Sequence, residues 1–262
     1  MDKILSGKTA LVCGSTQGIG KATALKLAQM GANIVLMARD LTKLETTLEE
    51  LSTSNKQSHL YISADFTKPT EVKEKIEAFV KSNGPIHILV NNTGGPKGGP
   101  IKDAAPEEFL AAFNQHLICN HILAQAIYPG MITAGYGRII NIISTSVKQP
   151  LPNLGVSNTI RGAVASWSKT LANELGQYGI TVNNVLPGAT NTIRLQSIAE
   201  TKAEKTGESV DQIFAEMADE SPMKRIAQPE EIAAAVAFLA SPEASYINGI
   251  NVPVDGGRTK SL

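Results

Sequence analysis

Short hydrophobic runs alternate with longer amphipathic segments along the whole chain of 262 residues. The short runs are rich in Val, Ile and Leu, as strands are when helices cover both faces of their sheet. The longer segments repeat their apolar residues at the spacing of one helix face. Strands are predicted over 9–13, 33–38, 59–63, 86–92, 138–144, 180–186 and 250–255, and helices over 18–30, 41–52, 69–82, 106–131, 156–175 and 229–241.

This alternation predicts one α/β domain of the doubly wound, Rossmann type. Strands joined through helices run parallel, so about seven of them make a parallel sheet with helices on both faces. No linker or shift in composition divides the chain, and we therefore expect a single domain over residues 1–262. Pro129 is expected to kink or end the helix over 106–131, because proline cannot donate a helical hydrogen bond.

A glycine-rich stretch, CGSTQGIGKA, joins the first predicted strand to the first predicted helix. Gly14, Gly18 and Gly20 allow the backbone to turn tightly and to approach a diphosphate, and the helix start offers unpaired N–H groups to that anion. The spacing is G-x-x-x-G-x-G, and its place between a strand and a helix is the one that a dinucleotide site requires. The stretch favours a dinucleotide cofactor; the alternative is a purely structural turn.

The end of the second predicted strand bears on the choice between NAD and NADP. An acidic residue there would hydrogen-bond the adenosine ribose of NAD and repel a 2′-phosphate. The chain instead has Ala38 and then Arg39, whose guanidinium can grip a phosphate, while Asp40 can cap the next helix at Leu41. These residues favour NADP, with NAD as the weaker alternative. Arg39 has a second explanation as an exposed charge at the helix entry.

Composition and charge narrow the classes of partner. Lys and Arg together number 24, as do Asp and Glu, and no long basic run is present. Nucleic acid and anionic membranes are therefore not expected partners. Cys13 and Cys119 lie far apart and no metal-ligand spacing occurs, which suits a reducing compartment and a protein without a bound metal. No run approaches the roughly 20 apolar residues that cross a bilayer, and no apolar signal segment precedes the first strand, so we expect a cytoplasmic protein.

Five motifs, in their usual order, resemble those of the short-chain dehydrogenase/reductase family. They are GSTQGIG (14–20), NNTGG (91–95), RIINIIS (138–144), ITVNNVLPG (180–188) and INVPVDGG (250–257). The likeness is strongest to 3-oxoacyl-acyl-carrier-protein reductases and similar carbonyl reductases, and it covers nearly the whole chain. It implies a Rossmann-type oxidoreductase that acts on a small carbonyl or alcohol.

The resemblance also implies which residues bind the cofactor. They are Gly14, Ser15, Thr16, Gly18, Ile19, Gly20, Arg39, Asp65, Phe66, Asn91, Gly94, Pro187, Gly188 and Thr192. Asp65 would lie beside the adenine, and Asn91 with Gly94 would support the cofactor beneath the sheet. Pro187 and Gly188 would face the nicotinamide.

The segment from about residue 192 to 222 would form a substrate lid. By resemblance, Thr192 at its start would contact the carboxamide or the phosphates of the cofactor. A lid that orders over the ligand fits the polar, Lys- and Glu-rich composition, although a solvated surface helix has the same composition. Relatives assemble as dimers or tetramers, so a homo-oligomer is expected, with a homotetramer as the specific form.

Four places carry the chemistry in this family, and they usually hold Asn, Ser, Tyr and Lys. Tyr donates a proton to the carbonyl oxygen while the nicotinamide gives a hydride to the carbon. Lys lowers the Tyr pKa and holds the nicotinamide ribose. Here the Ser place holds Ser144, but the Asn, Tyr and Lys places hold His116, Ser157 and Arg161. None of the five tyrosines has a lysine four positions later, so no shifted pair replaces them.

The altered set changes the expected proton chemistry. Ser157 and Arg161 share one helix face, but arginine stays protonated and cannot shuttle a proton. Serine is a poorer acid than phenol and would reach a carbonyl only through a water. His116 has an ordinary pKa of about 6.5, which suits proton transfer at neutral pH. The structural alternatives are that Ser157 caps its helix, that His116 is a satisfied buried histidine and that Arg161 pairs with a carboxylate.

Two hypotheses of function follow. The first is an NADP(H)-dependent oxidoreductase for a ketone and its secondary alcohol, with a 3-oxoacyl thioester as one candidate substrate. Ser144 would polarise the oxygen, Arg161 would position the cofactor, and His116 or a water held by Ser157 would move the proton. The second is a cofactor-binding but catalytically silent subunit that regulates or assembles with an active relative.

Overall fold

Seven strands form one parallel sheet in the computed structural model, which describes residues 3–261. The strands are β1 (Thr9–Cys13), β2 (Asn33–Ala38), β3 (Leu60–Ser63), β4 (Ile88–Asn91), β5 (Gly137–Ile142), β6 (Ile180–Pro187) and β7 (Asn251–Val254). Their order across the sheet is β3-β2-β1-β4-β5-β6-β7, and every neighbouring pair is parallel. The predicted fold class, a doubly wound parallel sheet of about seven strands, is confirmed.

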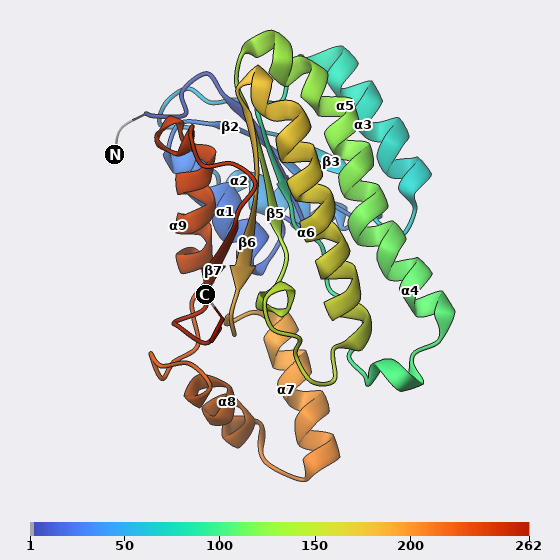
Figure 1. Ribbon diagram of the computed structural model, residues 1–262. Coiled ribbons are helices and arrows are strands. Elements are labelled where there is room, and N and C mark those ends of the chain that lie inside the picture. Colours follow the sequence, from blue (N-terminus) through green and yellow to red (C-terminus); the bar gives the residue numbers. More distant parts are fainter. Residues whose placement is uncertain (1–2, 262) are drawn as a thin grey trace.

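Helices cover both faces of the sheet (Figure 1). One face carries α1 (Gly18–Gln29), α2 (Leu41–Glu49) and α9 (Pro229–Ala240), and the other carries α3 (Pro69–Asn83), α4 (Pro106–Phe113), α5 (Cys119–Ala134) and α6 (Gly155–Leu175). Each face has its own hydrophobic core: Leu44 and Val236 are buried in one, and Ile76 and Leu123 in the other. This explains why the strands are apolar at nearly every position. Over residues 3–261 no helix combines the length and the apolar character that a membrane span needs.

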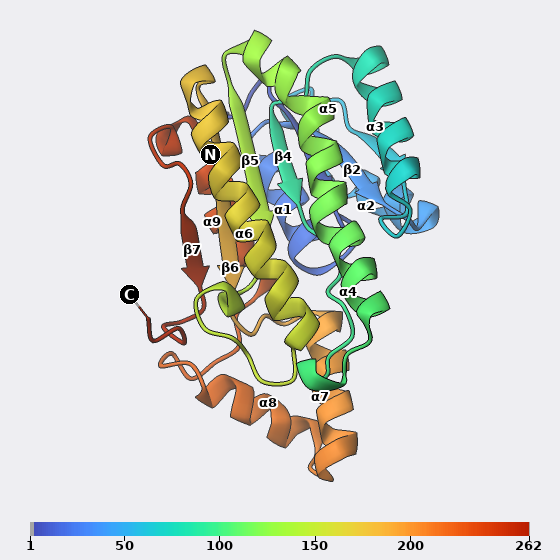
Figure 2. The ribbon, with the colours of Figure 1, turned by 45° about the vertical axis from the view of Figure 1, so that its right-hand side comes forward.

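The strand order reverses between β1 and β4, and this reversal places the ligand crevice. In open parallel sheets, ligands bind outside the carboxyl ends of the strands at such a reversal. Two further helices, α7 (Ile193–Thr206) and α8 (Val210–Asp219), extend beyond the carboxyl ends of β6 and β7 (Figure 2). The segment predicted to be a lid therefore lies at the end of the sheet where the crevice opens.

A row of asparagine side chains crosses the buried half of the sheet. Asn91, Asn141, Asn184 and Asn251 pair in register on β4 to β7. Each amide donates to the next amide oxygen, at 2.8 Å, 3.0 Å and 2.8 Å. Such pairing makes buried amides tolerable inside a parallel sheet, although among residues 3–261 the Asn91 Oδ1 at the end of the row has no partner. The Asn91 side chain, predicted to support the cofactor, is thus engaged within the sheet.

The long helical pattern over 106–131 forms two α-helices joined by a π-helical turn, Asn114–Ile118. Pro129 does not end the second of these helices, because α5 continues to Ala134. The carbonyl that Pro129 leaves without its helical partner belongs to Gln125, which is an exposed residue. π-turns inside helices frequently mark functional sites, and His116 lies in the middle of this one.

Candidate functional site

The loop after β1 is packed too tightly for a side chain at its first or last glycine. A Cβ at Gly14 would lie 2.5 Å from the carbonyl oxygen of Asn92, and one at Gly20 would lie 2.1 Å from the carbonyl oxygen of Gly14. The amide of Asn92 donates to the carbonyl oxygens of Cys13, at 3.2 Å, and Gly14, at 3.4 Å. Tertiary packing therefore fixes this loop. The residue that braces it is Asn92, which the sequence analysis did not single out.

The start of α1 offers an anion site above this loop. Gln17 flanks the helix without a side-chain capping bond, and the first turn has no acidic residue, so its N–H groups remain available to a ligand. Gly18 turns the chain there with a φ of 52°. The Thr192 methyl comes within 3.1 Å of the place where a Gly18 Cβ would be. The residues present therefore fit a dinucleotide diphosphate, with Thr192 beside it.

The end of β2 is arranged as the sequence predicted. The Asp40 carboxylate caps α2 by accepting a hydrogen bond from the Lys43 N–H at 3.1 Å. Arg39 is exposed at the strand end. A hydrogen bond from the Thr67 N–H, with a contribution from the charge of Arg39, lowers the pKa of Asp65. Because Asp40 is occupied as a cap, the basic side chain at this strand end stands free to meet a 2′-phosphate.

His116 is buried, with 1% of its surface exposed, and its Nδ1 lies 2.5 Å from the Thr93 hydroxyl oxygen. Its Nε2 is buried and has no hydrogen-bond partner in the part of the chain that the structure describes. Burial, together with the charge of Arg161, lowers the pKa of His116 from 6.5 to about 2. The expectation of a pKa near neutrality is therefore wrong: the imidazole stays neutral because nothing solvates or balances its charged form. The alternative of a fully satisfied histidine is also wrong.

Ser157 does not cap α6. The helix begins at Gly155 with Leu154 flanking it, so Ser157 lies within the first turn, partly exposed and without a side-chain hydrogen bond. Ser144, at the end of β5, accepts a hydrogen bond from the Ser146 N–H at 3.1 Å and begins a short 3₁₀ turn. Both hydroxyls can therefore still donate a hydrogen bond to a ligand or a water.

Arg161 lies one helical turn after Ser157 and is 8% exposed. Its Nη1 donates to the carbonyl oxygen of Ile142 at 3.1 Å. Across residues 3–261 no carboxylate pairs with it, so the alternative of an ion pair is wrong. Burial, with Arg194 nearby, lowers the pKa of Arg161 to about 10, and the guanidinium remains charged at neutral pH.

Other predicted residues lie around the same crevice. Pro187 ends β6, and the Gly188 N–H donates to the Val254 carbonyl oxygen at 3.0 Å, which holds this corner against β7. The Gly94 carbonyl oxygen accepts a hydrogen bond from Gln115 at 3.2 Å. Thr16 and Phe66 lie in the turns after β1 and β3, and Ile19 lies in the first turn of α1. No contact with a cofactor is established for these residues, and their roles stay predictions. Over residues 3–261 no group of His, Cys, Asp or Glu is placed to hold a metal ion.

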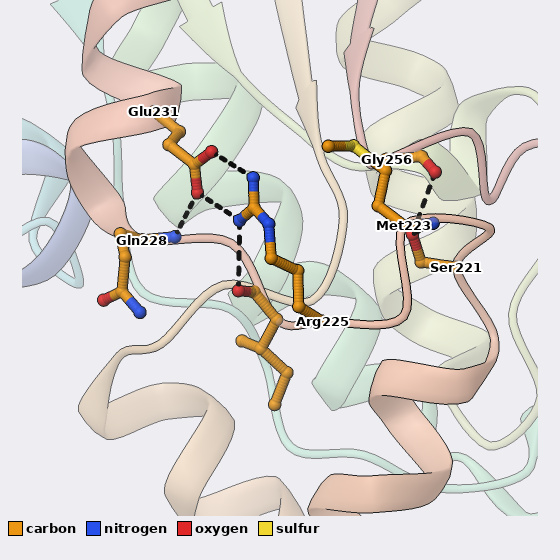
Figure 3. A network of polar contacts seen from close by, with 7 residues as sticks. Ser221, Met223, Arg225, Gln228, Glu231 and Gly256 are labelled. Carbon is orange, nitrogen blue, oxygen red and sulfur yellow. Dashed lines mark hydrogen bonds and ion pairs between the residues drawn. The ribbon is translucent and has the colours of Figure 1, made fainter.

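A polar network fastens the chain between α8 and α9 (Figure 3). Arg225 donates to both carboxylate oxygens of Glu231, at 2.7 Å and 2.6 Å. Glu231 also accepts from the Gln228 N–H, and these bonds, first those from Arg225, lower its pKa to about 2. Ser221 donates to the Gly256 carbonyl oxygen at 2.9 Å. The far end of segment 192–222 is thereby tied to α9 and to the chain after β7.

Comparison with known proteins places this geometry in a family. Residues 14–259 match the model of a family described as Enoyl-(Acyl carrier protein) reductase. An NADPH-dependent reductase, BacG of Bacillus subtilis, is 32% identical over 259 residues, which are 98% of this chain and 100% of that protein. The 3-oxoacyl-[acyl-carrier-protein] reductase FabG of Vibrio cholerae is 33% identical and covers 97% of this chain and 98% of its own. This chain belongs to the short-chain dehydrogenase/reductase family.

A solved structure of the family agrees over the whole chain. L-sorbose reductase from Gluconobacter frateurii, in complex with NADPH and L-sorbose, superposes with a TM-score of 0.93 at 35% identity and full coverage of both chains. The resemblance inferred from the five motifs is therefore confirmed. Within this short-chain dehydrogenase/reductase, the departures predicted at His116, Ser157 and Arg161 stay predictions from the resemblance.

Proposed function

We propose that the protein is an NADP(H)-dependent oxidoreductase that interconverts a ketone and its secondary alcohol. The observation that carries the proposal is the loop from Gly14 to Gly20: it is fixed by Asn92 and points the free start of α1 into the crevice. Arg39 beside the capped Asp40 supports NADP over NAD. The NADPH-dependent relatives add weight to the same choice of cofactor.

The residues of the crevice have different proposed roles toward the cofactor and the substrate. The first turn of α1 would hold the diphosphate through its N–H groups, and Arg39 would hold the 2′-phosphate. Arg161 would hold the nicotinamide ribose through its remaining N–H donors. When bound, the cofactor supplies a hydride to the carbonyl carbon. Ser144 donates a hydrogen bond to the carbonyl oxygen and polarises it.

The proton comes from a water rather than from a side chain. His116 is neutral, and its pKa of about 2 leaves it unprotonated at any ordinary pH. Arg161 keeps its proton because its pKa remains near 10. We assign Ser157, which is partly exposed and unbonded, to holding a water against the substrate oxygen. That water gives its proton to the oxygen as the hydride arrives, and solvent neutralises the hydroxide left behind.

The magnitudes permit turnover without tyrosine. Loss of a general acid costs about 10²–10⁴-fold in rate. Alignment of the hydride donor with the carbonyl is worth effective molarities on the order of 10⁵–10⁸ M. Positioning is the larger contribution, and the glycine loop with the free start of α1 supports it by providing a place for the cofactor. We therefore expect slow but real reduction.

Kinetics with a restored active site test this proposal. NADPH oxidation is followed by absorbance with a panel of ketones that includes 3-oxoacyl thioesters, using the natural protein and a Ser157→Tyr/Arg161→Lys double variant. We expect slow, ketone-dependent oxidation by the natural protein and an increase in kcat of about 10²–10⁴-fold in the double variant. Calorimetry with NADPH is the binding control. Tight NADPH binding with turnover in the double variant alone would instead favour the catalytically silent subunit.

A homo-oligomer, dimer or tetramer, stays a prediction from the resemblance, and a cytoplasmic location stays a prediction from the cysteines and the apolar pattern of the sequence. Light scattering coupled to size-exclusion chromatography measures the molar mass and hence the oligomeric state. A mass equal to one chain at micromolar concentration would contradict it.

A further inference from the structure

The substrate side of the crevice contains positive charge, and no acidic group among residues 3–261 balances it. Arg161 is 8% exposed and bonds only to a backbone carbonyl oxygen. Buried charges in proteins are ordinarily paired, because an isolated one loses its hydration without compensation. The nicotinamide ribose that Arg161 would hold is neutral and does not supply the missing charge.

A second arginine, Arg194, acts on Arg161 from the segment 192–222, which is predicted to form the lid. Arg194 lies in the first turn of α7, and its Nη2 donates to the Pro96 carbonyl oxygen at 2.6 Å. Its guanidinium covers Gly95, where an added Cβ would lie 3.7 Å from Nη2. The charges of Arg161 and Arg194 interact, and no acidic group within residues 3–261 acts on either of them. Arg194 thus links the lid to the loop after β4 and keeps most of its N–H donors free.

A third group nearby also lacks a partner. His116 Nε2 is buried and unbonded, and the charge of Arg161 acts on this imidazole. Its other nitrogen is held by Thr93, which precedes Gly95 by two residues in the same loop. Two guanidinium groups and one orphaned imidazole nitrogen therefore belong to one neighbourhood, bordered by α6, α7 and the loop after β4. Groups of this kind bind an oxyanion.

We propose that the substrate carries a carboxylate in addition to its carbonyl or hydroxyl group, and that Arg194 binds that carboxylate. Arg161 contributes its charge from below, and the fork of Arg194 offers paired N–H donors that match two carboxylate oxygens. Arg194 is then a specificity-determining residue outside the family's four usual places. This inference rests on the proposed oxidoreductase function and narrows its substrates to oxo acids and hydroxy acids.

The cofactor is the other source of anionic oxygens, and its own sites lie elsewhere. The diphosphate has the start of α1, and the 2′-phosphate has the end of β2. Arg194 is turned instead toward Gly95 and Pro96, on the loop that follows β4. This placement favours the substrate as the source of the anion.

Paired acids and esters provide the test. The protein loaded with NADP⁺ is titrated in a calorimeter with pyruvate, acetoacetate and levulinate, and with the methyl ester of each. We expect one acid to bind at least about 10-fold more tightly than its ester, because a charge-assisted bond is lost in the ester. Arg194→Gln should remove this preference, and Arg194→Lys should recover part of it by restoring the charge without the fork. Lys205→Gln removes one positive charge from the far end of the same helix and should leave the preference intact.

Three results separate the explanations. Equal binding of every acid and its ester by the natural protein would overturn the carboxylate site. An Arg194→Gln variant that binds NADPH 10-fold more weakly, with its acid preference unchanged, would assign the arginine to the cofactor and also overturn it. Failure of the natural protein to bind NADPH at all would instead remove the proposed oxidoreductase function. Thermal unfolding of each variant confirms that it is folded.

Discussion

The crevice at the carboxyl ends of the strands has two sides that differ in how far they follow their family. On the side of β1 and β2, the glycine loop, the uncapped start of α1 and the basic strand end are all in place. On the side of β5 and α6, the resemblance predicts that only Ser144 keeps the usual residue of the four catalytic places. The first side binds a dinucleotide that is the same for many enzymes, whereas the second meets the substrate.

The difference teaches that the departures on the second side are physically coupled. On this side, Thr93 is the hydrogen-bond partner of His116. The arginine in the Lys place faces a second arginine on the lid, Arg194. His116 and Arg161 therefore each have a structural counterpart, and two arginine charges meet on this side of the crevice.

The largest effect should come from a change on the cofactor side. In Gly20→Ala, the new Cβ would meet the rigid Gly14 carbonyl oxygen at 2.1 Å, so the loop must move away from the start of α1. We expect NADPH affinity to fall at least about 100-fold in calorimetry, with a loss of about 1–3 kcal/mol in the free energy of unfolding. Gly162→Ala is the control, because its Cβ would meet no atom within 4 Å. Wild-type NADPH affinity in Gly20→Ala would contradict the role given to this loop.

On the side of the crevice that contains His116, we expect an effect on the pH dependence of the free energy of unfolding. The folded pKa of His116 is depressed to about 2, so below pH 6.5 the unfolded chain takes up a proton that the folded chain refuses. Stability is therefore unaffected by this group above pH 6.5 and falls as the pH decreases from there. Between pH 7.5 and 5 we expect the natural protein to lose about 2 kcal/mol more than His116→Asn in chemical denaturation.

The same pair of proteins tests the proton source. Because His116 does not titrate near neutrality, the pH profile of kcat in the natural protein should show no inflection near 6.5 that His116→Asn abolishes. Parallel stability curves for the two proteins, or an inflection that depends on His116, would restore this histidine as the general acid.

The smallest effect is expected at the lid fastening, which lies outside both sides of the crevice. Glu231→Gln removes an exposed carboxylate that Arg225 holds with two bonds, and exposed pairs contribute little to global stability. We expect a small decrease in the unfolding temperature and faster limited proteolysis within residues 192–222. Glu230→Gln removes one negative charge from the neighbouring position, for which no ion pair is found among the described residues. This variant should be cleaved by the protease at the wild-type rate. Equal cleavage of the two variants would show that the pair does not hold the lid.

The sequence by itself determined the order of the strands and helices, the position of the glycine loop and the family. These features follow from local sequence patterns, namely apolar runs, helical spacing, and glycines at a strand-to-helix turn. It also identified Asp40 correctly as a cap, because capping depends on residues a few positions apart. The sequence did not decide whether Pro129 ends its helix. That outcome depends on the surroundings of the Gln125 carbonyl group, which proline leaves without its helical partner.

Only the tertiary structure decided the state of the catalytic side. The pKa of His116, the lack of an ion partner for Arg161 and the approach of Arg194 all depend on which groups meet across the fold. The same is true of Asn92, whose amide braces a loop 78 residues earlier. Burial and charge balance are properties of a three-dimensional neighbourhood, and a residue's type and spacing along the chain do not contain them.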